Sequence, residues 1–289
     1  MTSLMTHREK DTFGPWAIVT GASSGIGKEF ARQLAASGLN LVLVARRLTT
    51  LEEVGRSFAT EFGIQYRAVG LDLTTDDFLG KLEEATHDLD IGLVVSNAGV
   101  NLTGDFLTMD HQAWQQSLYL NVKAHLEVAH HFGPHLAQRR RGGLLLLAST
   151  GALQGIPFNA EYAAAKAYVL SLGEALHVEF QRVGVHVTVL LPGATDTPML
   201  AASGIDQASL PGIMKPMSPQ QCVAEGLAAL KANRATHIAG RLNRIMAASI
   251  PRSLATRLYG SMTARVLAQR SLEAGTKTDR VNEQYAPSR

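Results

Sequence analysis

Thr20-Gly-Ala-Ser-Ser-Gly-Ile-Gly27 directly follows the apolar run Ala17–Thr20 and opens a helical pattern. Gly21, Gly25 and Gly27 allow a tight turn without Cβ clashes, and they let a bulky anion approach the N-terminus of the following helix. The free N–H groups and the dipole of that helix favour negative charge. A glycine-rich turn that binds nothing is the alternative, because this spacing is not the general G-x-G-x-x-G fingerprint.

Short apolar runs alternate with longer helical patterns along most of the chain. The predicted strands are Ala17–Thr20, Leu41–Ala45, Gln65–Leu71, Ile91–Ser96, Leu144–Ser149, Val185–Leu191 and His237–Ala239. The predicted helices are Gly27–Gly38, Leu51–Phe62, Thr75–Asp88, Asp110–Arg139, Ala160–Val183 and Pro219–Ala232. Because the first six strands are apolar without alternation, helices should cover both faces of the sheet. The sequence therefore predicts an α/β fold: a Rossmann-type, doubly wound parallel sheet in three α/β/α layers.

The composition excludes several classes of protein. Of 289 residues, 46% are hydrophobic and 18% are charged, which supports a sizeable core and argues against disorder. A net charge of +2 argues against nucleic-acid binding, and no run approaches the ~18 apolar residues that a membrane-spanning helix needs. The polar start, Met1–Phe13, lacks the apolar core of a secretory signal, and the single cysteine, Cys222, excludes an internal disulfide. These features predict a cytoplasmic protein.

The chain has no obvious linker, which predicts one dinucleotide-binding and catalytic Rossmann domain over residues 1–240. Residues 199–219, rich in Pro, Gly, Met and Ala, follow the last long strand and are interpreted as a substrate lid. Residues 241–289 are predicted to form a basic, amphipathic, helical C-terminal extension. Within it, a helix should begin near Arg252 or Ser253, because Pro251 breaks the segment.

The stretch that leads into the C-terminal extension and covers its first part carries charge of one sign. Between Gly226 and Leu272 the chain has basic residues and no acidic ones: Lys231, Arg234, Arg241, Arg244, Arg252, Arg257, Arg265 and Arg270. Beside them, an apolar residue recurs every four positions at Leu254, Leu258, Met262 and Val266. Three readings of this apolar stripe stay open: packing onto the domain or a partner subunit, contact with an anionic membrane surface, or cover over a substrate cleft.

The end of the second strand bears on the choice of dinucleotide. An NAD site usually places an acidic residue there to bind the ribose 2′-OH. Here the strand ends in Ala45 and runs into Arg46 and Arg47, whose guanidinium groups suit a 2′-phosphate and predict NADP(H). The alternative is that they only solvate a loop. Asp72, which precedes Leu73 past the third strand, either accepts from the adenine amino group or caps the next turn.

Ser149 closes a strand, and Tyr162-Ala-Ala-Ala-Lys166 follows on a helix. Residues four apart share a helix face, so the phenol and the ammonium should lie side by side. A nearby lysine and an oxidised nicotinamide would stabilise the phenolate and lower the tyrosine pKa from about 10 towards the working range. A second match, Tyr119-Leu-Asn-Val-Lys123, has no strand-end serine shortly upstream and is interpreted as helix packing and surface.

Taken together, these residues resemble the classical short-chain dehydrogenase/reductase family from about Gly14 to Gly240. The matching elements, in the family's order, are Thr20–Gly27, Ser96-Asn-Ala-Gly99, Asn121, Ser149, Tyr162, Lys166 and Pro192-Gly-Ala-Thr-Asp-Thr197. The resemblance implies that Tyr162 is the acid/base and that Ser149 polarises the substrate carbonyl. It also implies that Lys166 holds the nicotinamide ribose and that Asn121 anchors a water in the proton relay.

The resemblance also implies which residues bind the cofactor. The glycine loop would bind the pyrophosphate, Asn97–Gly99 would line the adenosine–ribose side, and Pro192–Thr197 would contact the nicotinamide carboxamide. The predicted cofactor-binding residues are Gly21, Ser23, Ser24, Gly25, Ile26, Gly27, Arg46, Arg47, Asp72, Leu73, Asn97, Ala98, Gly99, Tyr162, Lys166, Pro192, Gly193, Thr195 and Thr197. The sequence departs from the family in having Ser96 where an asparagine is usual, and in having no basic residue within the glycine loop.

The predicted substrate is bulky and apolar. Leu153, Ile156, Pro157 and Phe158, with the apolar lid, favour a medium-to-large hydrophobic ketone or alcohol. The predicted function is therefore an NADP(H)-dependent oxidoreductase that interconverts a carbonyl and a secondary alcohol by hydride transfer. The alternatives are a non-catalytic dinucleotide-binding or scaffold protein on the same fold, and a membrane-surface lipid or steroid reductase that uses the basic tail.

Two further expectations concern assembly and metals. The resemblance suggests a homodimer or homotetramer formed through the predicted helices Asp110–Arg139 and Ala160–Val183, whose alanine-rich faces permit close approach. No metal is expected, because the histidines lack cysteine neighbours and the H-E-x-x-H pattern. Four of them are interpreted as an exposed helix flank or a subunit contact: His125, His130, His131 and His135.

Overall fold

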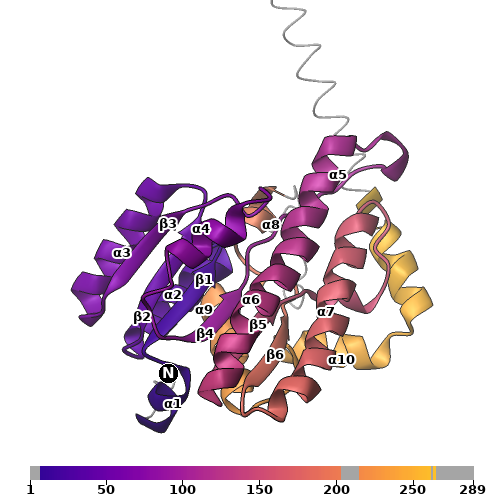
Figure 1. Cartoon of the computed structure of the whole chain (residues 1–289). Helices are drawn as coiled ribbons and strands as arrows, with labels where there is room; N and C mark the ends of the chain where they lie inside the picture. The colour runs from indigo at the N-terminus through magenta and orange to yellow at the C-terminus, as the bar shows by residue number, and fades with distance from the viewer. Residues whose placement is uncertain (1–6, 203–214, 262, 265–289) are drawn as a thin grey trace, which may run out of the picture.

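A parallel sheet forms the centre of the computed structural model, which describes residues 7–202, 215–261, 263 and 264 (Figure 1). Its strands are β1 (Trp16–Thr20), β2 (Asn40–Ala45), β3 (Tyr66–Gly70), β4 (Ile91–Ser96), β5 (Gly143–Leu147), β6 (His186–Leu191) and β7 (Thr236–Ile238). Within the described residues, the sheet has seven strands in the order β3-β2-β1-β4-β5-β6-β7, all paired in parallel. The strand order reverses between β1 and β4, which opens a crevice at their carboxyl ends.

Helices cover both faces of this sheet. One face carries α2 (Gly25–Ala36), α3 (Leu48–Phe62) and α9 (Pro219–Lys231), and the other carries α4 (Phe78–Glu84), α6 (Ala124–Arg139) and α7 (Ala160–Gln181). Strand side chains alternate between the two apolar layers, so Val19 packs in the first and Ile18 in the second. The predicted three-layer, doubly wound fold is therefore confirmed.

Two predicted helices have different bounds. The single helix predicted over 110–139 is instead α5 (His111–Leu118), a π-helical turn (Tyr119–Lys123) and α6. The helix predicted to begin at Thr75 begins at Phe78, because the residues before it form a turn. In this turn, the Thr74 N–H donates to the Asp72 carboxylate at 2.9 Å. Hydrophobic periodicity alone detects neither the π-helical turn nor the side-chain bond.

The structure also contains elements too short to show a period in the sequence. They are helices α1 (His7–Phe13) and α8 (Pro198–Ala202) and the 3₁₀ turns Phe106–Thr108 and Thr150–Leu153. Helix α1 is anchored by Phe13, which is buried and packs edge-on against His186 with ring centres 5.5 Å apart. This contact joins the start of the described chain to the start of β6.

The beginning of the predicted C-terminal extension is helical. Helix α10 covers Arg241–Ser249, and a further helix begins at Arg252, as predicted, and continues to residue 261. We call this second helix the C-terminal helix. The domain boundary at residue 240 stays a prediction. None of the helices in the described ranges is long and apolar enough to cross a membrane.

The two described leucines of the apolar stripe face away from the domain. Leu254 and Leu258 are 48% and 47% exposed, whereas Ala255 is buried. The reading in which these two leucines pack onto their own domain is therefore wrong, and the partner-subunit and membrane readings stay predictions. Other parts of these sequence predictions lie outside the described residues, namely the Met262 side chain, Val266 and residues 203–214 of the lid.

Gly173 sets how closely α7 approaches the sheet. A Cβ at this position would overlap the Val189 side chain on β6 and press on Leu146 of β5. We predict that Gly173→Ala lowers the free energy of unfolding by about 1–3 kcal/mol, because overpacking forces neighbouring side chains out of their rotamers. Urea denaturation of the purified protein measures this change.

Two further variants test the cause of that loss. In a Val189→Ala background, the cost of Gly173→Ala should shrink, because the smaller neighbour leaves room for the added methyl. Gly80→Ala on α4, where a Cβ meets nothing within 4 Å, should be neutral or stabilising. The same cost of Gly173→Ala in both backgrounds would contradict the proposed contact with Val189.

Candidate active site

A cleft of about 1020 Å³ lies at the carboxyl ends of the strands, where the strand order reverses. All the residues predicted to bind the cofactor line it: Gly21, Ser23, Ser24, Gly25, Ile26, Gly27, Arg46, Arg47, Asp72, Leu73, Asn97, Ala98, Gly99, Tyr162, Lys166, Pro192, Gly193, Thr195 and Thr197. Ser149 also lines the cleft, whereas Asn121 is buried and is not among its lining residues. The fold thus brings the predicted residues together, while their individual roles stay predictions.

The glycine loop turns sharply beside the end of β2. Gly21 and Gly25 have φ angles of 69° and 55°, in the region that favours glycine, and the Gly21 N–H donates to the Val44 carbonyl at 2.8 Å. Ser24 precedes α2 as its N-cap residue but makes no side-chain bond to the first helical turn. The N–H groups of that turn are therefore left for an anion in the cleft.

Asn97 ties the glycine loop to β4. Its Nδ2 donates to the Thr20 carbonyl at 2.8 Å. The main-chain N–H groups of Asn97 and Ala98 donate to Thr20 Oγ1 at 2.9 and 3.0 Å. These bonds fix the two segments that, by the family resemblance, would hold the pyrophosphate and the adenosine.

Arg46 and Arg47 are exposed at one end of the cleft. Neither guanidinium is paired with another residue in the described part of the chain, so both are available to a phosphate. Asp72 Oδ1 accepts from the N–H and the hydroxyl of Thr74 at 2.9 and 2.8 Å. One oxygen of Asp72 therefore makes the turn-capping bonds of the alternative interpretation, although the residue also lines the cleft.

Tyr162 and Lys166 lie side by side, as their spacing predicts. Lys166 Nζ is 5.8 Å from the centre of the Tyr162 ring and donates to the Leu147 carbonyl at 3.0 Å. Ser149 Oγ accepts from the Gly151 N–H at 3.1 Å, and its hydrogen bond with the phenol acts to lower the pKa of Tyr162. The serine, the phenol and the ammonium therefore converge in one cleft.

Burial controls the ionisation of this pair. It raises the pKa of Tyr162 above its ordinary value and lowers the pKa of Lys166 to about 8. The lowering of the Tyr162 pKa by Lys166 together with an oxidised nicotinamide concerns the cofactor-bound protein and stays a prediction. At neutral pH the phenol keeps its proton and Lys166 is mostly charged.

Asn121 lies in the π-helical turn between α5 and α6, and such turns often occur at functional sites. Its buried Nδ2 donates to the Val100 carbonyl at 2.8 Å and to Ser117 Oγ at 3.0 Å. The other Tyr–Lys pair flanks this residue: Tyr119 is 37% exposed, and Lys123 Nζ lies 4.7 Å from its ring centre. That pair is on the surface, as predicted.

The Pro192–Thr197 segment forms a wall beside the glycine loop. A Cβ at Gly25 would press on the Thr197 side chain, so the two segments are in close contact. Thr197 Oγ1 accepts from the Leu200 N–H at 3.3 Å. Thr195 is buried, and its hydroxyl donates to the Gly193 carbonyl at 3.1 Å. Both threonines line the cleft, although the two hydroxyls already bond within the protein.

Sequence reasoning misses a buried pair next to Lys166. Ser96 Oγ and His125 Nδ1 are 2.8 Å apart, and both residues are buried. Burial and the charge of Lys166 hold the pKa of His125 well below its usual value, so the imidazole is neutral. The interpretation of His125 as part of an exposed flank is therefore wrong. The signal that could have found the pair is the unusual Ser96, because a buried hydroxyl requires a hydrogen-bond partner.

Apolar groups line another part of the cleft. Ile156, Met199 and Leu200 contribute to it, together with Tyr259 and Thr263 from the C-terminal part of the chain. Of the residues predicted to contact the substrate, Ile156 is in this lining, and so are Met199 and Leu200 of the predicted lid. Leu153, Pro157 and Phe158 are not in it, and their contact with the substrate stays a prediction.

Pro157 instead supports the C-terminal helix. A Cβ at Gly260 would overlap the Pro157 ring, so this helix rests directly on the loop before α7. The contact positions Tyr259, the neighbour of Gly260, in the cleft wall. For the described part of the extension, this placement fits the reading in which the tail covers the substrate cleft.

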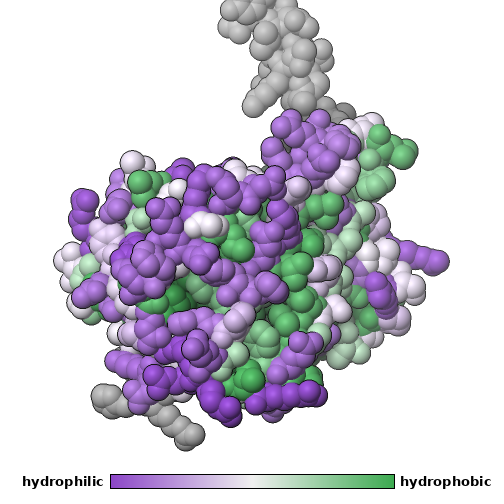
Figure 2. Space-filling model, in the orientation of Figure 1, coloured by the Kyte–Doolittle hydropathy of each residue, from purple (hydrophilic) through white to green (hydrophobic). Residues whose placement is uncertain are grey.

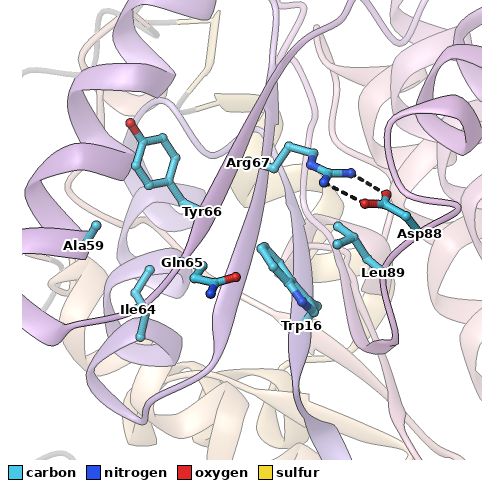
Figure 3. Close-up of a pocket in the computed structure, with 8 residues that line it drawn as sticks. All are labelled: Trp16, Ala59, Ile64, Gln65, Tyr66, Arg67, Asp88 and Leu89. Carbon is cyan, nitrogen blue, oxygen red and sulfur yellow. Dashed lines mark hydrogen bonds and ion pairs between the residues drawn. The ribbon is translucent and has the colours of Figure 1, made fainter.

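A second hollow lies at the opposite, amino ends of the strands (Figure 3). Its charged side chains are Arg67 and Asp88, which are joined by two hydrogen bonds of 2.6 and 2.9 Å. The Arg67 guanidinium holds the pKa of Asp88 at about 2. We assign no chemistry to this hollow, because these charges neutralise each other. Over the described ranges, no group of three His, Cys, Asp or Glu residues is placed to hold a metal.

The main cleft has the shape that a dinucleotide requires. A Cβ at Gly27 would overlap the Gly21 carbonyl, and a Cβ at Gly99 would press on Asn121 Oδ1 and Lys166 Nζ. At both positions the absence of a side chain lets the chain pack closely, beside the uncapped start of α2 and beside Lys166. The cleft contains Arg46, the start of α2 and Lys166, an arrangement that suits a nicotinamide dinucleotide.

Comparisons with a family model and with individual known proteins point to the same family. The short chain dehydrogenase family matches residues 15–208. A 7β-hydroxysteroid dehydrogenase of Clostridium sardiniense is 33% identical over 240 residues, covering 83% of this chain and 90% of that protein. A very-long-chain 3-oxoacyl-CoA reductase-like protein of Arabidopsis thaliana is 35% identical over 213 residues, covering 72% of this chain and 68% of that protein.

Solved structures agree with this result. A structure from a study of 7β-hydroxysteroid dehydrogenase stereoselectivity has a TM-score of 0.80 and 27% identity, and the match covers 86% of this chain and 98% of the other. A short-chain dehydrogenase from Sphingobium yanoikuyae, in complex with NADPH, has a TM-score of 0.73 and 27% identity, with 92% and 96% covered. Because the family match spans most of the Rossmann fold and both relatives extend over most of this chain, the protein belongs to the short-chain dehydrogenase family and is an oxidoreductase that acts on CH–OH groups.

Proposed function

We propose that this protein is an NADP(H)-dependent oxidoreductase that interconverts a carbonyl and a secondary alcohol on a medium-to-large hydrophobic substrate. The observation that carries this proposal is the convergence of Ser149, Tyr162 and Lys166 in the cleft that also contains the glycine loop. The NADPH bound in the Sphingobium relative supports the choice of cofactor, as does the unpaired Arg46.

The residues of the cleft divide the chemistry between them. When bound, the nicotinamide supplies or accepts the hydride at the substrate carbon. Ser149 Oγ donates a hydrogen bond to the substrate oxygen, and Tyr162 gives that oxygen a proton during reduction or removes one during oxidation. Lys166 holds the nicotinamide ribose and stabilises the phenolate. Asn121 anchors the water through which the proton is exchanged with solvent.

The substrate end of the cleft favours a bulky molecule. Ile156, Met199, Leu200 and Tyr259 present apolar surface there, which suits a steroid or a long acyl chain. The names of the relatives, a hydroxysteroid dehydrogenase and a very-long-chain 3-oxoacyl-CoA reductase-like protein, support the same substrate size. Because Tyr259 comes from the C-terminal helix, this helix would contribute to substrate selection.

The surface of α5, α6 and α7 supports a homo-oligomer. Figure 2 shows hydrophobic residues on the face of the molecule that carries α6 and α7. Large apolar side chains of these helices are 36% to 56% exposed: Leu118, Leu126, Tyr168 and Val178. A second copy of the chain would cover such a surface, in agreement with the predicted homodimer or homotetramer.

The proton-transfer role of Tyr162 gives the most direct test. We predict that Tyr162→Phe lowers kcat for NADPH-dependent ketone reduction by at least about 10²-fold, because the general acid is lost, while the Kd for NADPH changes by less than about threefold. Steady-state nicotinamide absorbance and fluorescence titration measure the two quantities. Tyr119→Phe, at the surface pair, should have no effect, and an active Tyr162→Phe enzyme would refute the mechanism.

Arg46 should determine the preference between the two dinucleotides. We predict that Arg46→Ala raises the Kd for NADPH by about 10- to 100-fold, because a charge-assisted bond to the 2′-phosphate is lost, and leaves the weaker NADH binding nearly unchanged. Arg141→Ala removes an exposed charge at the opposite end of the strands and serves as the control. Equal losses for NADPH and NADH in Arg46→Ala would contradict the 2′-phosphate assignment.

Tyr259 should discriminate among substrates by size. We predict that Tyr259→Ala raises KM for bulky steroid-like ketones by about tenfold, because apolar contact is lost, and changes KM for small ketones by less than about twofold. Leu258→Ala, on the exposed side of the same helix, is the matched control and should behave like the unmodified protein. Parallel changes for large and small ketones would show that Tyr259 does not contact the substrate.

A further inference from the structure

Lys166 presents an electrostatic problem that the proposed mechanism does not solve. Its side chain is almost completely buried, and its Nζ donates to a main-chain carbonyl, that of Leu147, at 3.0 Å. A buried ammonium is costly unless a negative charge lies nearby. Among the described residues, the carboxylate that acts on Lys166 belongs to Glu161, which raises the lysine pKa against the effect of burial.

Glu161 is held in place from another helix. Its Oε2 accepts from Ser117 Oγ at 2.7 Å, although the two residues are 44 positions apart in the chain. Ser117, on α5, is buried. The other carboxylate oxygen of Glu161, Oε1, is also buried, and it has no hydrogen-bond partner among the described residues. Burial raises the pKa of Glu161, and the Ser117 bond and the charge of Lys166 act to lower it. A half-buried carboxylate is thus anchored within one residue of Tyr162.

Ser117 also connects this carboxylate to Asn121. Asn121 Nδ2 donates to Ser117 Oγ at 3.0 Å, and Ser117 Oγ donates to Glu161. A serine hydroxyl has one proton to give, so an ionised Glu161 directs that proton away from Asn121 and leaves a lone pair for Nδ2. The Asn121 side-chain amide must then keep its Oδ1 towards Val100, whose N–H donates to this oxygen at 3.2 Å.

The charge on Glu161 has a further consequence for Tyr162. A carboxylate disfavours a second negative charge nearby, and Glu161 acts to raise the pKa of Tyr162. Among the described residues, the titratable groups on which Glu161 acts are Tyr162 and Lys166, both on α7. The neighbouring elements contribute Ser117 and Asn121, which do not titrate. Glu161 therefore acts on both members of the Tyr–Lys pair, although it does not line the cleft.

We propose that Glu161 is a positioning residue of the active site: through its hydrogen bond with Ser117 it fixes Asn121, and its carboxylate acts on the Tyr162–Lys166 pair that follows it on α7. The catalytic consequences of this inference rest on the proposed function. The effect of the Glu161 charge on Tyr162 and Lys166 does not. A neutral phenol is the form that donates a proton to a carbonyl oxygen. Glu161 would therefore extend carbonyl reduction to higher pH.

The sign of the expected pH effect follows from the charge. Reduction requires the protonated phenol, so kcat/KM for reduction falls as the pH rises through the pKa of Tyr162. Glu161→Gln removes a negative charge near the phenol. Its removal stabilises the phenolate and so lowers the pKa of Tyr162. We expect the midpoint of the alkaline fall to move down by about 0.5–1 pH unit, so that reduction on the alkaline limb is about three- to tenfold slower.

Two variants separate the charge from other effects. Glu174→Gln removes the same charge from an exposed position on the same helix and should leave the midpoint unchanged. Ser117→Ala keeps the Glu161 charge but breaks its link to Asn121. We expect Ser117→Ala to lower kcat by about three- to tenfold with a midpoint shift of less than about 0.3 unit. A residue with a merely structural role would lower the plateau without moving the midpoint.

A second readout does not depend on turnover. Tyrosinate absorbance, measured as the difference between each protein and its Tyr162→Phe counterpart, follows the Tyr162 phenol in the full chain without substrate. Glu161→Gln should lower this titration midpoint by the same 0.5–1 unit. Unmoved midpoints in both measurements would overturn the inference. A shifted absorbance midpoint in a protein that reduces no ketone would support the electrostatic role of Glu161 and reject the proposed function instead.

Discussion

The geometry of the site depends on the hydrogen bonds that join Thr20, at the end of β1, to Asn97 and Ala98, after β4. The Thr20 carbonyl and hydroxyl accept three bonds across this junction. Because the strand order reverses there, the chains leave the sheet in opposite directions, and side-chain bonds must hold the floor of the crevice. The glycine loop and the segment before Gly99 are thereby held against each other at the floor of the cleft, and the small residue at position 99 lets Lys166 approach Asn121.

Spacing in the sequence predicts the groups whose positions follow from regular geometry. Tyr162 and Lys166 share a helix face, and Ser149 follows a strand whose carboxyl end meets the same edge of the sheet, so their convergence is predictable. The bond between Ser117 and Glu161 is not predictable, because it joins two helices through residues that have no periodic or compositional signal. The π-helical turn is not predictable either, since one wide turn barely changes the hydrophobic pattern around Asn121.

In the C-terminal helix, a clear hydrophobic pattern does not decide which face packs on the domain. Leucines recur every four residues, but so do Ala255 and Tyr259, and it is the latter pair that faces the protein. The inward face must pass close to Pro157, where Gly260 leaves no room for a Cβ. Small side chains and one cleft-lining phenol therefore satisfy that contact better than a row of leucines. Shape, rather than hydrophobicity, decides the orientation of this helix.

Burial makes Tyr162 a weaker acid and Lys166 a weaker base, so it opposes loss of the phenol proton, whereas the ammonium of Lys166 favours that loss. At neutral pH the site contains a buried ammonium beside a neutral phenol. When the phenol gives up its proton, the lone charge of Lys166 gains an opposite charge within a medium that strengthens their attraction. The attraction within the ionised pair then offsets part of the free-energy cost of burying Lys166. Glu161 moderates this gain, because its carboxylate already offsets part of the ammonium charge before the phenolate forms.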